Sequence, residues 1–487
     1  MYPDHIVIED MIRYTDSMQT FEKLFIGGAW RDSRGASRTL LAPATELAHA
    51  TVRDAIAADV DDAVDAARRA ARAWAETSPA ERAALVASIG SCLGERAEEL
   101  ARDFAIEIGT PIADARRLQV QPALRVFAQA PVLAAHFASP EHLGETRVRR
   151  VPIGVAACIT PWNYPLYQIA TKIVPALVAG ASVILKPSEL TPLSVYALAR
   201  CAELTRFPSG VLNIVFGGAE IGRQLVEHPG VDVVSFTGST VVGRQVGARG
   251  GAALKKVTLE LGGKSAGIVL ADADLKHAVQ QTLAKCYQNA GQTCAALTRL
   301  LVPRPQLDAA ISFAAPEAAT YRVGDPFDPA TRVGPLISAQ QRDRVTGMIQ
   351  RAIDEGASVV SGGSGRPSQR SRGYFVSPTV LVVEQQNAEI AQEEVFGPVL
   401  VLQPYEDEGE AVAIANGTPF GLSGAVWSAD PLHAETVAQR LRAGSVSING
   451  AATHPDAPFG GFGASGFGRE RGRYGLDTYS TTQALHR

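Results

Sequence analysis

A cysteine at position 294 stands between a stretch with the pattern of a helix and one with the pattern of a strand. Residues 274–289 carry apolar side chains at helical spacing, Gly291 is expected to cap that helix, and residues 298–303 are apolar enough for a strand. Cys294 would therefore lie in a connection, where side chains are available for chemistry. That position suits a nucleophilic thiol, but no histidine lies nearby in the sequence to activate it, so these residues alone favour an inert packing cysteine over a nucleophile.

A glutamate inside an apolar segment is the second candidate. In "TLELGGKS" (258–265), Glu260 ends an apolar run and is followed by two glycines. A buried carboxylate is costly, and burial raises its pKa toward the range of a general base. A helix-capping or ion-pairing glutamate would explain the same residue.

A glycine-containing turn could hold a phosphate. "VSFTGSTVVGRQVG" (234–247) predicts a strand, a tight turn and the start of a helix. Gly238 would let the backbone approach a ligand, and Ser239 could cap the helix or contact a phosphate at its positive end. Arg244 stands where a P-loop requires lysine, so this is not a P-loop, and an ordinary β-to-α turn fits equally well.

Two further segments could position polar groups at strand ends. In "SVILKPSELTP" (182–192), Lys186 and Glu189 follow a strand, where ligands of open α/β sheets bind, and could hold ribose hydroxyls. A surface ion pair is the alternative. In "TPWNYP" (160–165), two prolines would make a rigid turn that fixes the Asn163 amide as an oxyanion donor. A plain Asx-turn is the alternative there.

The elements that must carry these residues are those of an α/β protein with two large domains. Residues 59–75 and 78–108 are alanine-rich and helical, with a capping box at Ser78 and Glu81. Beyond residue 150, short apolar runs without polar alternation alternate with helical segments, which predicts parallel strands buried on both faces. The final segment, 476–487, could form a strand whose edge needs a partner, for which another subunit is one candidate.

Composition excludes several classes of function. The 487 residues carry a net charge of −4, with 46 Lys and Arg against 50 Asp and Glu, which gives no reason to expect nucleic acid. The longest apolar run, 173–185, is too short for a membrane span. Residues 1–20 are too charged for a signal peptide and are expected to form a loose tail, so a cytoplasmic location is expected.

The cysteines also favour a cytoplasmic location. The five cysteines are scattered without a CxxC pair, so we expect no metal site, no disulfide framework and a reducing compartment. Apart from Cys294, the cysteines are expected to be packing residues: Cys92, Cys158, Cys201 and Cys286.

Seven motifs in this order resemble the aldehyde dehydrogenase superfamily, and the match runs from residue 23 to residue 479. They are "PWNYP", "KPSE", "FTGST", "ELGGKS", "GQTC", "EEVFGP" and "PFGGFGASGFGRE". The resemblance implies an α/β fold with a Rossmann-type cofactor domain, an α/β catalytic domain and a small oligomerisation element. The implied boundaries are 1–20 for the tail, 21–130 and 152–262 for the NAD-binding domain, 263–461 for the catalytic domain, and 131–151 with 476–487 for oligomerisation.

The resemblance also implies a role for each catalytic residue. Cys294 would attack the aldehyde to form a thiohemiacetal, and Asn163 with the Cys294 N–H would hold the oxyanion. Hydride transfer to NAD would leave a thioester, which water activated by Glu260 would hydrolyse. Lys172 and Glu470 match positions proposed to relay protons away from the base.

NAD is the implied cofactor, since a carboxylate at Glu189 would repel the 2′-phosphate of NADP. The implied cofactor-binding residues are Thr160, Pro161, Trp162, Lys186, Glu189, Gly238, Ser239, Gly243, Leu261, Glu394 and Phe396. The implied walls of the substrate tunnel are Tyr164, Gln168, Thr293, Ala295 and Phe459. Because that set contains no arginine for a second carboxylate, we expect an uncharged aliphatic or aromatic aldehyde. His454 is expected to be a loop histidine.

Two other functions remain as alternatives to a dehydrogenase that releases a free acid. In a CoA-acylating semialdehyde dehydrogenase, CoA would take the acyl group, but such relatives usually lack the base glutamate that Glu260 supplies. A catalytically silent structural or binding protein could keep the same fold, although Cys294 and Glu260 are both present. The expected partners are a small aldehyde and further copies of the chain, as a homodimer or homotetramer, without nucleic acid, membrane or metal.

Overall fold

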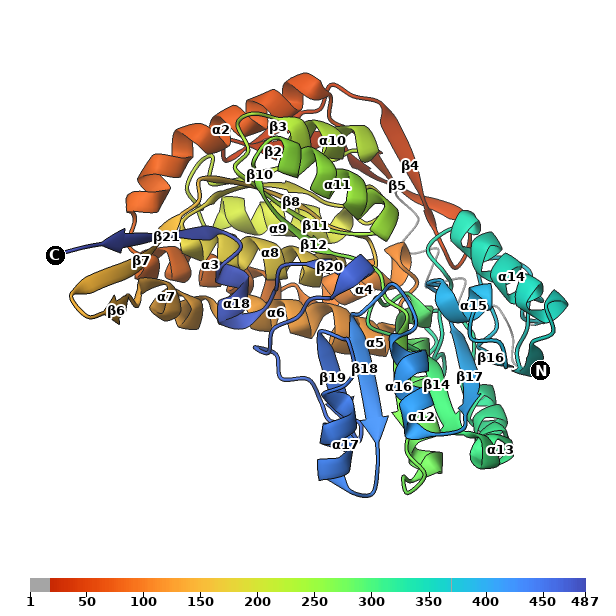
Figure 1. Cartoon of the computed structure of the whole chain (residues 1–487). Coiled ribbons are helices and arrows are strands. Elements are labelled where there is room, and N and C mark those ends of the chain that lie inside the picture. Colours follow the sequence, from red (N-terminus) through yellow and green to blue (C-terminus); the bar gives the residue numbers. More distant parts are fainter. Residues whose placement is uncertain (1–17, 369) are drawn as a thin grey trace.

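The computed structural model describes residues 18–368 and 370–487 (Figure 1). The predicted N-terminal tail lies outside the described residues up to position 17. Its last residues belong to strand β1 (Gln19–Phe21), which pairs in parallel with β5 (Leu47–Arg53). Strand β4 (Ser37–Ala42) pairs with the other edge of β5 and completes a three-stranded sheet.

The larger sheet has eight strands in the order β20-β12-β11-β8-β9-β10-β2-β3. Its five central strands run parallel: β8 (Val155–Ile159), β9 (Ser182–Lys186), β10 (Leu212–Ile214), β11 (Val233–Thr237) and β12 (Lys256–Glu260). Every residue of β8, β9 and β11 is buried, as the apolar runs predict. The edges are antiparallel: β2 (Lys23–Ile26), β3 (Ala29–Asp32) and β20 (Gly466–Phe467).

Helices cover both faces of this sheet (Figure 1). One face carries α2 (Ala57–Glu76), α10 (Ala219–Glu227) and α11 (Thr240–Ala252). The other carries α8 (Pro165–Ala179) and α9 (Leu193–Leu204). Behind α8 and α9 lies a second layer: α3 (Pro79–Gly94), α4 (Ala97–Glu107), α6 (Gln121–Ala128) and α7 (Ala130–Ala138). The predicted capping box of α3 is present, since Ser78 and Glu81 exchange hydrogen bonds.

Short turns complete this helical layer. Between α4 and α6 the chain passes through α5 (Ile112–Asp114) and the π-helical turn η1 (Ala115–Val120).

The second sheet has seven strands in the order β15-β16-β17-β14-β13-β18-β19, parallel except for β15. The strands are β13 (Ser265–Val269), β14 (Leu297–Pro303), β15 (Ser358–Ser361), β16 (Thr379–Val382), β17 (Val399–Tyr405), β18 (Ser423–Trp427) and β19 (Ser445–Ile448). The principal helices around it are α12 (Leu275–Tyr287), α13 (Leu307–Ala319), α14 (Ala339–Asp354), α16 (Glu408–Asn416) and α17 (Pro431–Ala438). Shorter turns are η2 (Gln288–Gly291), η3 (Arg304–Gln306), α15 (Glu389–Gln392) and η4 (Gly463–Ser465).

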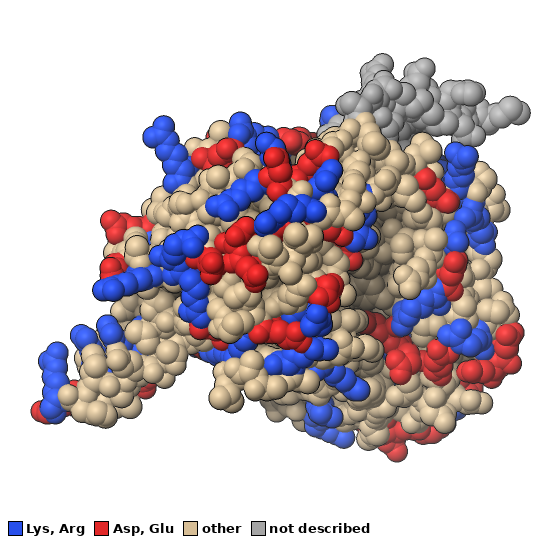
Figure 2. Space-filling model, turned by 90° about the horizontal axis from the view of Figure 1, so that it is seen from above, with Lys and Arg blue, Asp and Glu red and all other residues tan. Residues whose placement is uncertain are grey.

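A small fourth sheet projects from the side of the molecule (Figure 1). Helix α18 (Gly472–Leu476) leads into β21 (Ser480–Leu485), which pairs with β7 (Thr146–Pro152), and β7 pairs with β6 (Glu141–Leu143). The predicted terminal strand therefore finds a partner in its own chain. In Figure 2 this projection carries several basic side chains, whereas positive and negative side chains are interspersed over the rest of that face.

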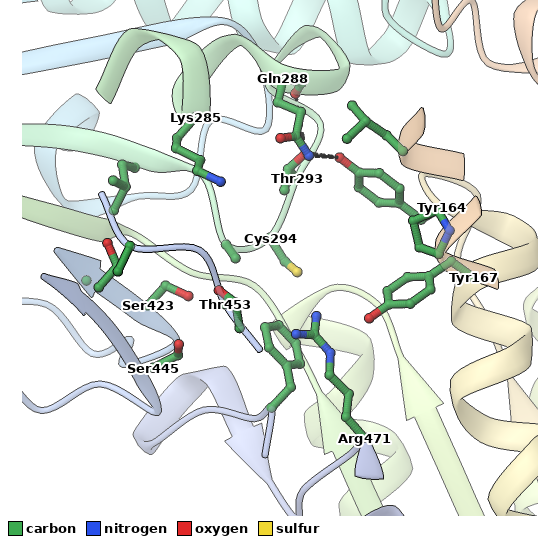
Figure 3. Close-up of a pocket in the computed structure, with 18 of the residues that line it drawn as sticks. Tyr164, Tyr167, Lys285, Gln288, Thr293, Cys294, Ser423, Ser445, Thr453 and Arg471 are labelled. Carbon is green, nitrogen blue, oxygen red and sulfur yellow. Dashed lines mark hydrogen bonds between the residues drawn. The ribbon is translucent and has the colours of Figure 1, made fainter. Parts of the chain in front are cut away.

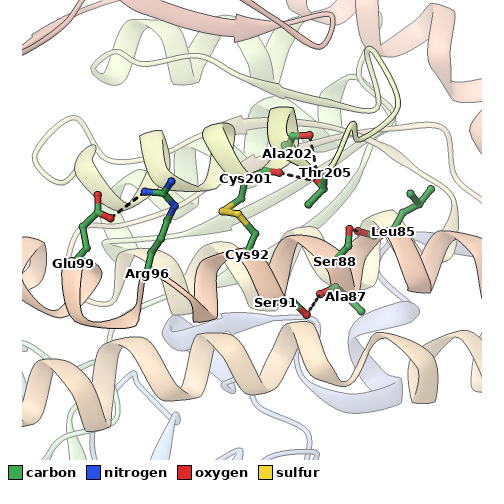
Figure 4. Close-up of a disulfide and its surroundings, with 10 residues drawn as sticks. All are labelled: Leu85, Ala87, Ser88, Ser91, Cys92, Arg96, Glu99, Cys201, Ala202 and Thr205. Atoms are coloured by element: carbon green, nitrogen blue, oxygen red, sulfur yellow. Dashed lines mark hydrogen bonds and ion pairs between the residues drawn. A yellow bond between two sulfur atoms is a disulfide. The ribbon is translucent and has the colours of Figure 1, made fainter.

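Two cysteines expected to be separate packing residues form a disulfide. Helix α3 packs against α9, which brings the Cα atoms of Cys92 and Cys201 to 5.7 Å and joins their sulfur atoms (Figure 4). The expectation of unpaired packing residues is wrong for this pair, because 109 residues separate them in the sequence and only helix packing makes them neighbours. Cys158 and Cys286 are buried and free, as expected.

No helix within the described parts of the chain is both long enough and apolar enough to cross a bilayer.

Candidate active site

Four neighbouring strands of the larger sheet bring predicted site residues to one edge. In the register of the sheet, Ile159 lies beside Lys186 in β9, and Thr237 of β11 lies beside Glu260 of β12. Because β8 separates β9 from β11, the carboxyl ends of all four strands form one continuous edge. Motifs at positions 160, 186, 238 and 260 therefore leave the sheet side by side, where open α/β sheets bind their ligands.

The turn before Cys294 has an unusual backbone. Helix α12 ends two residues before its predicted end, and Asn289 and Gly291 have φ angles of 54° and 73°. Gly291 is not a simple helix cap, because a Cβ there would lie 2.1 Å from the carbonyl of Gly397. Only glycine allows this close approach without displacing a backbone. The turn leaves Cys294 half-buried between α12 and β14.

A hydrogen-bond network fixes the residue that precedes the cysteine. The Tyr164 hydroxyl lies 2.7 Å from Thr293 Oγ1, and Gln288 Nε2 donates to Tyr164 Oη at 3.0 Å (Figure 3). Thr293 also donates to the Gln288 carbonyl at 3.3 Å. Two segments of the chain thus clamp the side of the turn next to Cys294.

Asn163 lies on the other side of the same turn. Its Nδ2 donates to the Gln292 carbonyl at 3.0 Å, and its own carbonyl accepts from Gln119 Nε2 and Asn289 Nδ2. The side chain is 4% exposed. An amide nitrogen carries two N–H groups, so one remains for an oxygen beside Cys294.

The thiol of Cys294 is held in its neutral form by its surroundings. Burial, together with the carboxylates of Glu394 and Glu260, raises the pKa of Cys294 to about 12, while Arg471 acts in the opposite direction. Thiolate, not thiol, is the nucleophile. A partner must therefore take the proton or supply positive charge when the site is occupied.

Glu260 is buried without a hydrogen-bonding partner. It is 2% exposed, and neither carboxylate oxygen has a partner among the described residues. Burial, followed by the charge of Glu470, raises the pKa of Glu260 well above its ordinary value. A Cβ at Gly460 would lie 2.8 Å from Glu260 Oε1, so the backbone there leaves little spare space around the carboxyl group. A buried carboxyl group with a raised pKa is suited to accept a proton from water.

Lys172 and Glu470 form a buried ion pair behind this carboxyl. Lys172 Nζ lies 2.5 Å from Glu470 Oε1 and 3.1 Å from Ser235 Oγ. Lys172 is completely buried and Glu470 is 5% exposed. The two residues are 298 positions apart, and the structure brings them together as the resemblance implies.

The predicted contacts for a dinucleotide gather along the sheet edge. Lys186 Nζ and Glu189 Oε2 are 3.5 Å apart, which places a donor and an acceptor together for hydroxyl groups. Ser239 caps α11 by accepting from the N–H of Val242, so its hydroxyl lies at the positive end of that helix.

Other predicted cofactor residues surround this edge. Leu261 packs against Gly243 of α11, since a Cβ at Gly243 would lie 2.3 Å from Leu261 Cδ2. Gly238 packs in the same way against the ring of Phe236. The hydroxyl of Thr160 is buried and lacks a partner in the described chain, and Pro161 follows it.

Glu394 reaches the same region from the second sheet. Its Oε1 accepts a hydrogen bond from the Gly263 N–H at 3.0 Å, and burial is the main cause that raises the pKa of Glu394 to about 7. Phe396, with a φ of 57°, packs edge-on against Trp162 at 5.6 Å. Donors, carboxylates and a helix N-terminus along one edge fit the ribose hydroxyls and pyrophosphate of NAD.

A cavity of about 310 Å³ lies beside the thiol (Figure 3). Cys294 lines it, and so do all five predicted tunnel residues: Tyr164, Gln168, Thr293, Ala295 and Phe459. Sequence reasoning missed several other walls: Tyr167, Lys285, Gln288, Ser423, Trp427, Ser445, Thr453 and Arg471. Tyr167, Gln288 and Arg471 lie within three residues of the "PWNYP", "GQTC" and "PFGGFGASGFGRE" motifs, but the others come from segments with no motif. His454 is exposed and does not line the cavity, although its neighbour Thr453 does.

The expectation of a tunnel without arginine is wrong. Arg471 lines the cavity beside Cys294, and Lys285 lies on its wall as well (Figure 3). The basis for predicting an uncharged aldehyde is therefore removed. Sequence alone could not place Arg471 in the cavity, because the direction of its side chain depends on the backbone φ at that residue rather than on a motif.

Comparisons with known proteins agree with this geometry. The model of the aldehyde dehydrogenase family matches residues 30–485. The chain is 42% identical to a 3-succinoylsemialdehyde-pyridine dehydrogenase from a Pseudomonas species, over 96% of this chain and 99% of that protein. A mutant of aldehyde dehydrogenase C from Pseudomonas syringae, in complex with NAD+ and octanal, superposes with a TM-score of 0.94 at 42% identity, covering 96% of this chain and 98% of that one.

A second solved structure supports the same assignment. An aldehyde dehydrogenase from Mycobacterium tuberculosis, in complex with NAD+, has a TM-score of 0.93 at 40% identity and covers 96% of this chain and 98% of its own. The predicted fold class and the predicted cofactor are thus confirmed. The chain belongs to the aldehyde dehydrogenase family and is an NAD-dependent aldehyde dehydrogenase.

Proposed function

We propose that the enzyme converts its aldehyde to a free carboxylic acid through a covalent intermediate on Cys294. The observation that carries this proposal is the arrangement around one thiol. Cys294 borders the cavity, Asn163 is hydrogen-bonded to the residue two positions before it, and Glu260 lies near enough for its charge to affect the pKa of the thiol. Nucleophile, oxyanion donor and base therefore converge on one point.

In the first half of the reaction, Cys294 gives its proton to water in the cavity and its sulfur attacks the carbonyl carbon. The carbonyl oxygen becomes an oxyanion, which the free N–H of Asn163 and the backbone N–H of Cys294 stabilise. Bound NAD supplies the hydride acceptor. The aldehyde C–H bond breaks with loss of hydride, the oxyanion re-forms the C=O bond and the bond between sulfur and carbon is kept, so the product of this half is a thioester on Cys294.

In the second half, Glu260 takes a proton from water and the water oxygen attacks the thioester carbon. The sulfur leaves as thiolate and the carboxylic acid is released. Glu470 and Lys172 would then carry the proton away from Glu260, since the charge of Glu470 already acts on that carboxyl. Because the pKa of Glu260 is raised, its basic form gains population as pH rises, and hydrolysis should accelerate with pH.

A free acid rather than an acyl-CoA is the proposed product. The carboxyl of Glu260 is buried, unpaired and close to Cys294, which supports hydrolysis by water. The CoA-acylating alternative predicts that CoA accelerates turnover. A silent protein predicts no NADH with any aldehyde. NAD is proposed over NADP, because the Glu189 carboxylate beside Lys186 would repel a 2′-phosphate.

The experiment is a rapid-mixing measurement of NADH absorbance with hexanal, benzaldehyde and 4-oxobutanoate, with and without CoA. Glu260→Gln should keep a burst of about one NADH per site and slow the following steady state about 100-fold or more. Glu22→Gln, a change at an exposed glutamate of the β1–β2 connection, is the matched control and should leave both phases unchanged. A full steady-state rate in Glu260→Gln would assign the base elsewhere.

The remaining parts of the chain follow as proposals. We propose that residues 21–130 and 152–262 bind NAD and that residues 263–461 carry the catalytic cysteine. Residues 131–151 and 476–487 would form the contact in a homodimer or homotetramer, since β6 and β21 are the outer strands of the projecting sheet and leave edges for pairing. Size-exclusion chromatography with light scattering tests the oligomer.

A cytoplasmic location is the proposal from composition, and the Cys92–Cys201 disulfide argues against it, because disulfides are rare in reducing compartments. Alkylation of the protein inside intact cells, followed by mass spectrometry, tests it. In the cytoplasm, both cysteines should be found as alkylated thiols. Recovery of the intact disulfide from cells would place the protein in an oxidising compartment.

A further inference from the structure

Arg471 brings a positive charge into the cavity at the catalytic thiol. It follows Glu470 and immediately precedes α18, and its side chain lines the same cavity as Cys294 and Phe459. In Figure 3 the Arg471 guanidinium points into the space between Cys294 and Tyr167. The arginine is therefore positioned to touch whatever occupies the tunnel.

The backbone that directs this side chain is strained. Arg471 has a φ of 73° and a ψ of 151°, a region that is populated almost only by glycine. Gly472, with a φ of 48°, follows it. An arginine at such a position destabilises the fold relative to glycine, and strained residues of this kind cluster where a side chain must be aimed at a ligand.

The guanidinium is held in place without being neutralised. It packs over the Phe459 ring at 4.2 Å and lies 5.7 Å from the Tyr167 ring. No carboxylate in the described parts of the chain forms a salt bridge with it. Arg469 differs, because its Nη1 donates to the Gly461 carbonyl at 3.2 Å and to the Gly468 carbonyl at 2.6 Å. One arginine beside Glu470 supports the backbone, and the other faces the cavity.

No acidic group near Arg471 forms a salt bridge with it among the residues that the structure describes. Glu470 is paired with Lys172 at 2.5 Å. The pKa of Glu260 is raised well above its ordinary value, mainly by burial, which favours its neutral form. Lys285, an exposed residue of α12, adds a second cation to the cavity wall. Among the described side chains that line the cavity, Glu470 is paired with Lys172, whereas Arg471 and Lys285 form no salt bridge.

We propose that the tunnel accepts an aldehyde that carries a carboxylate, and that Arg471 is the residue that selects it. This proposal rests on the proposed function, since the aldehyde end must reach Cys294. A guanidinium whose flat face is packed on Phe459 keeps its N–H groups at the edge, where they can bind a carboxylate through two parallel hydrogen bonds. Lys285 would attract the same anion to the tunnel.

The test compares matched pairs of aldehydes with and without the carboxylate. The probes are 4-oxobutanoate against butanal and 5-oxopentanoate against pentanal, at saturating NAD, with kcat and KM measured separately for each. The wild-type enzyme should prefer each oxoacid in kcat/KM by about 10-fold or more, because a charge-assisted contact is added. Preference for the alkanal in both pairs would overturn the proposal.

Variants of Arg471 locate the origin of the preference. Arg471→Gln should raise KM for the oxoacids about 10- to 100-fold more than KM for the alkanals, whereas any change in kcat from losing a cation near Cys294 should be shared by both kinds of substrate. Arg471→Lys should retain part of the preference, because the charge stays while the paired N–H groups are lost. Arg473→Gln is the matched control, since Arg473 is an exposed arginine of α18 outside the cavity, and it should alter neither substrate.

Inhibition by succinate provides a second measurement, which still tests the proposal if the Arg471 variant folds poorly or turns over slowly. Succinate should inhibit butanal oxidation competitively in the wild type, and Arg471→Gln should weaken that inhibition about 10-fold or more. An equal fall in kcat for oxoacids and alkanals, with inhibition unchanged, would show that Arg471 acts on the thiol or oxyanion and would overturn the proposal. If the proposed function itself is wrong, no aldehyde will give NADH production that depends on Cys294. That result can be told apart from a wrong role for Arg471, which leaves NADH production intact and changes only the preference between substrates.

Discussion

Two regions of this enzyme use cysteine in opposite ways. Cys294 lies in an irregular turn between α12 and β14, half-buried and free at the edge of a cavity. Cys92 and Cys201 lie in regular helices that pack against each other, and they are joined (Figure 4). The free thiol needs left-handed residues such as Asn289 and Gly291 to present it, whereas the pair needs only two helix faces in contact.

The environment of a thiol alone does not reveal which use it has. Burial raises the pKa of Cys158 and Cys286 to about 12, as it does for Cys294. Those two side chains are fully buried, and neither of them lines the cavity that Cys294 borders. Access and the groups opposite the sulfur, not its resting pKa, therefore separate the candidate nucleophile from packing cysteines.

The strongest test of this contrast removes the sulfur from each kind of site. Cys294→Ala should lower kcat by about four orders of magnitude or more, because no covalent intermediate can form. Cys286→Ala, at a buried packing cysteine, should keep kcat within about 2-fold and reduce stability only slightly. Steady-state NADH production measures both. Substantial turnover by Cys294→Ala would remove Cys294 from the mechanism.

The disulfide should matter for stability rather than for catalysis. The bond closes a loop of 109 residues, and breaking it should lower the free energy of unfolding by about 2–4 kcal/mol through the gain in unfolded-chain entropy. Urea unfolding of the oxidised and the dithiothreitol-reduced enzyme measures this difference. In Cys92→Ser, dithiothreitol should have no further effect. A large loss of kcat on reduction would instead connect the helix pair to the active site.

The raised pKa of Cys294 predicts how the free thiol responds to pH. Since its pKa is about 12, the thiolate fraction of the cofactor-free enzyme should rise about tenfold for each pH unit between 7 and 10. The rate of alkylation of Cys294 by iodoacetamide should also rise about tenfold for each pH unit, whereas the disulfide-bonded Cys92 and Cys201 should not react. A plateau below pH 8 would mean that Arg471 or another cation lowers the pKa more than burial raises it.

The smallest expected effect comes from the clamp on the active-site turn. Tyr164→Phe removes the hydroxyl that contacts Thr293 and Gln288 and should lower kcat/KM about 3- to 10-fold. Tyr405→Phe is the matched control, since its buried hydroxyl donates to the Val269 carbonyl in the second sheet. That change should reduce stability and leave kcat/KM unchanged. Equal effects on kcat/KM would mean that the clamp does not position Cys294.

Some features could be predicted from the sequence because local pattern determines them. Strands β8, β9 and β11 are apolar on both faces, which only a covered parallel sheet explains. The capping box at Ser78 depends only on the four consecutive residues from Ser78 to Glu81. The five tunnel residues were identified by resemblance to a family whose motifs lie next to the thiol.

Other features depend on contacts that no local pattern records. The Cys92–Cys201 pair arises where α3 crosses α9, and the helix spacing that permits it is a property of packing. The direction of Arg471 follows from a φ of 73° at a residue that is not glycine, which sequence propensity argues against. The antiparallel edge strands β2, β3 and β20 pair with segments far away in the sequence or across a short turn, and no motif records which strand each one joins.

The pairing of β21 with β7 sets an order for folding during synthesis. Thr482 lies beside Arg150, so β7 leaves the ribosome more than 300 residues before its partner exists. Tyr479, which is 2% exposed in the hydrophobic core around the eight-stranded sheet, is synthesised equally late. The eight-stranded sheet and the projecting sheet therefore stay incomplete, with unpaired strand edges, until the last residues of the chain have been translated.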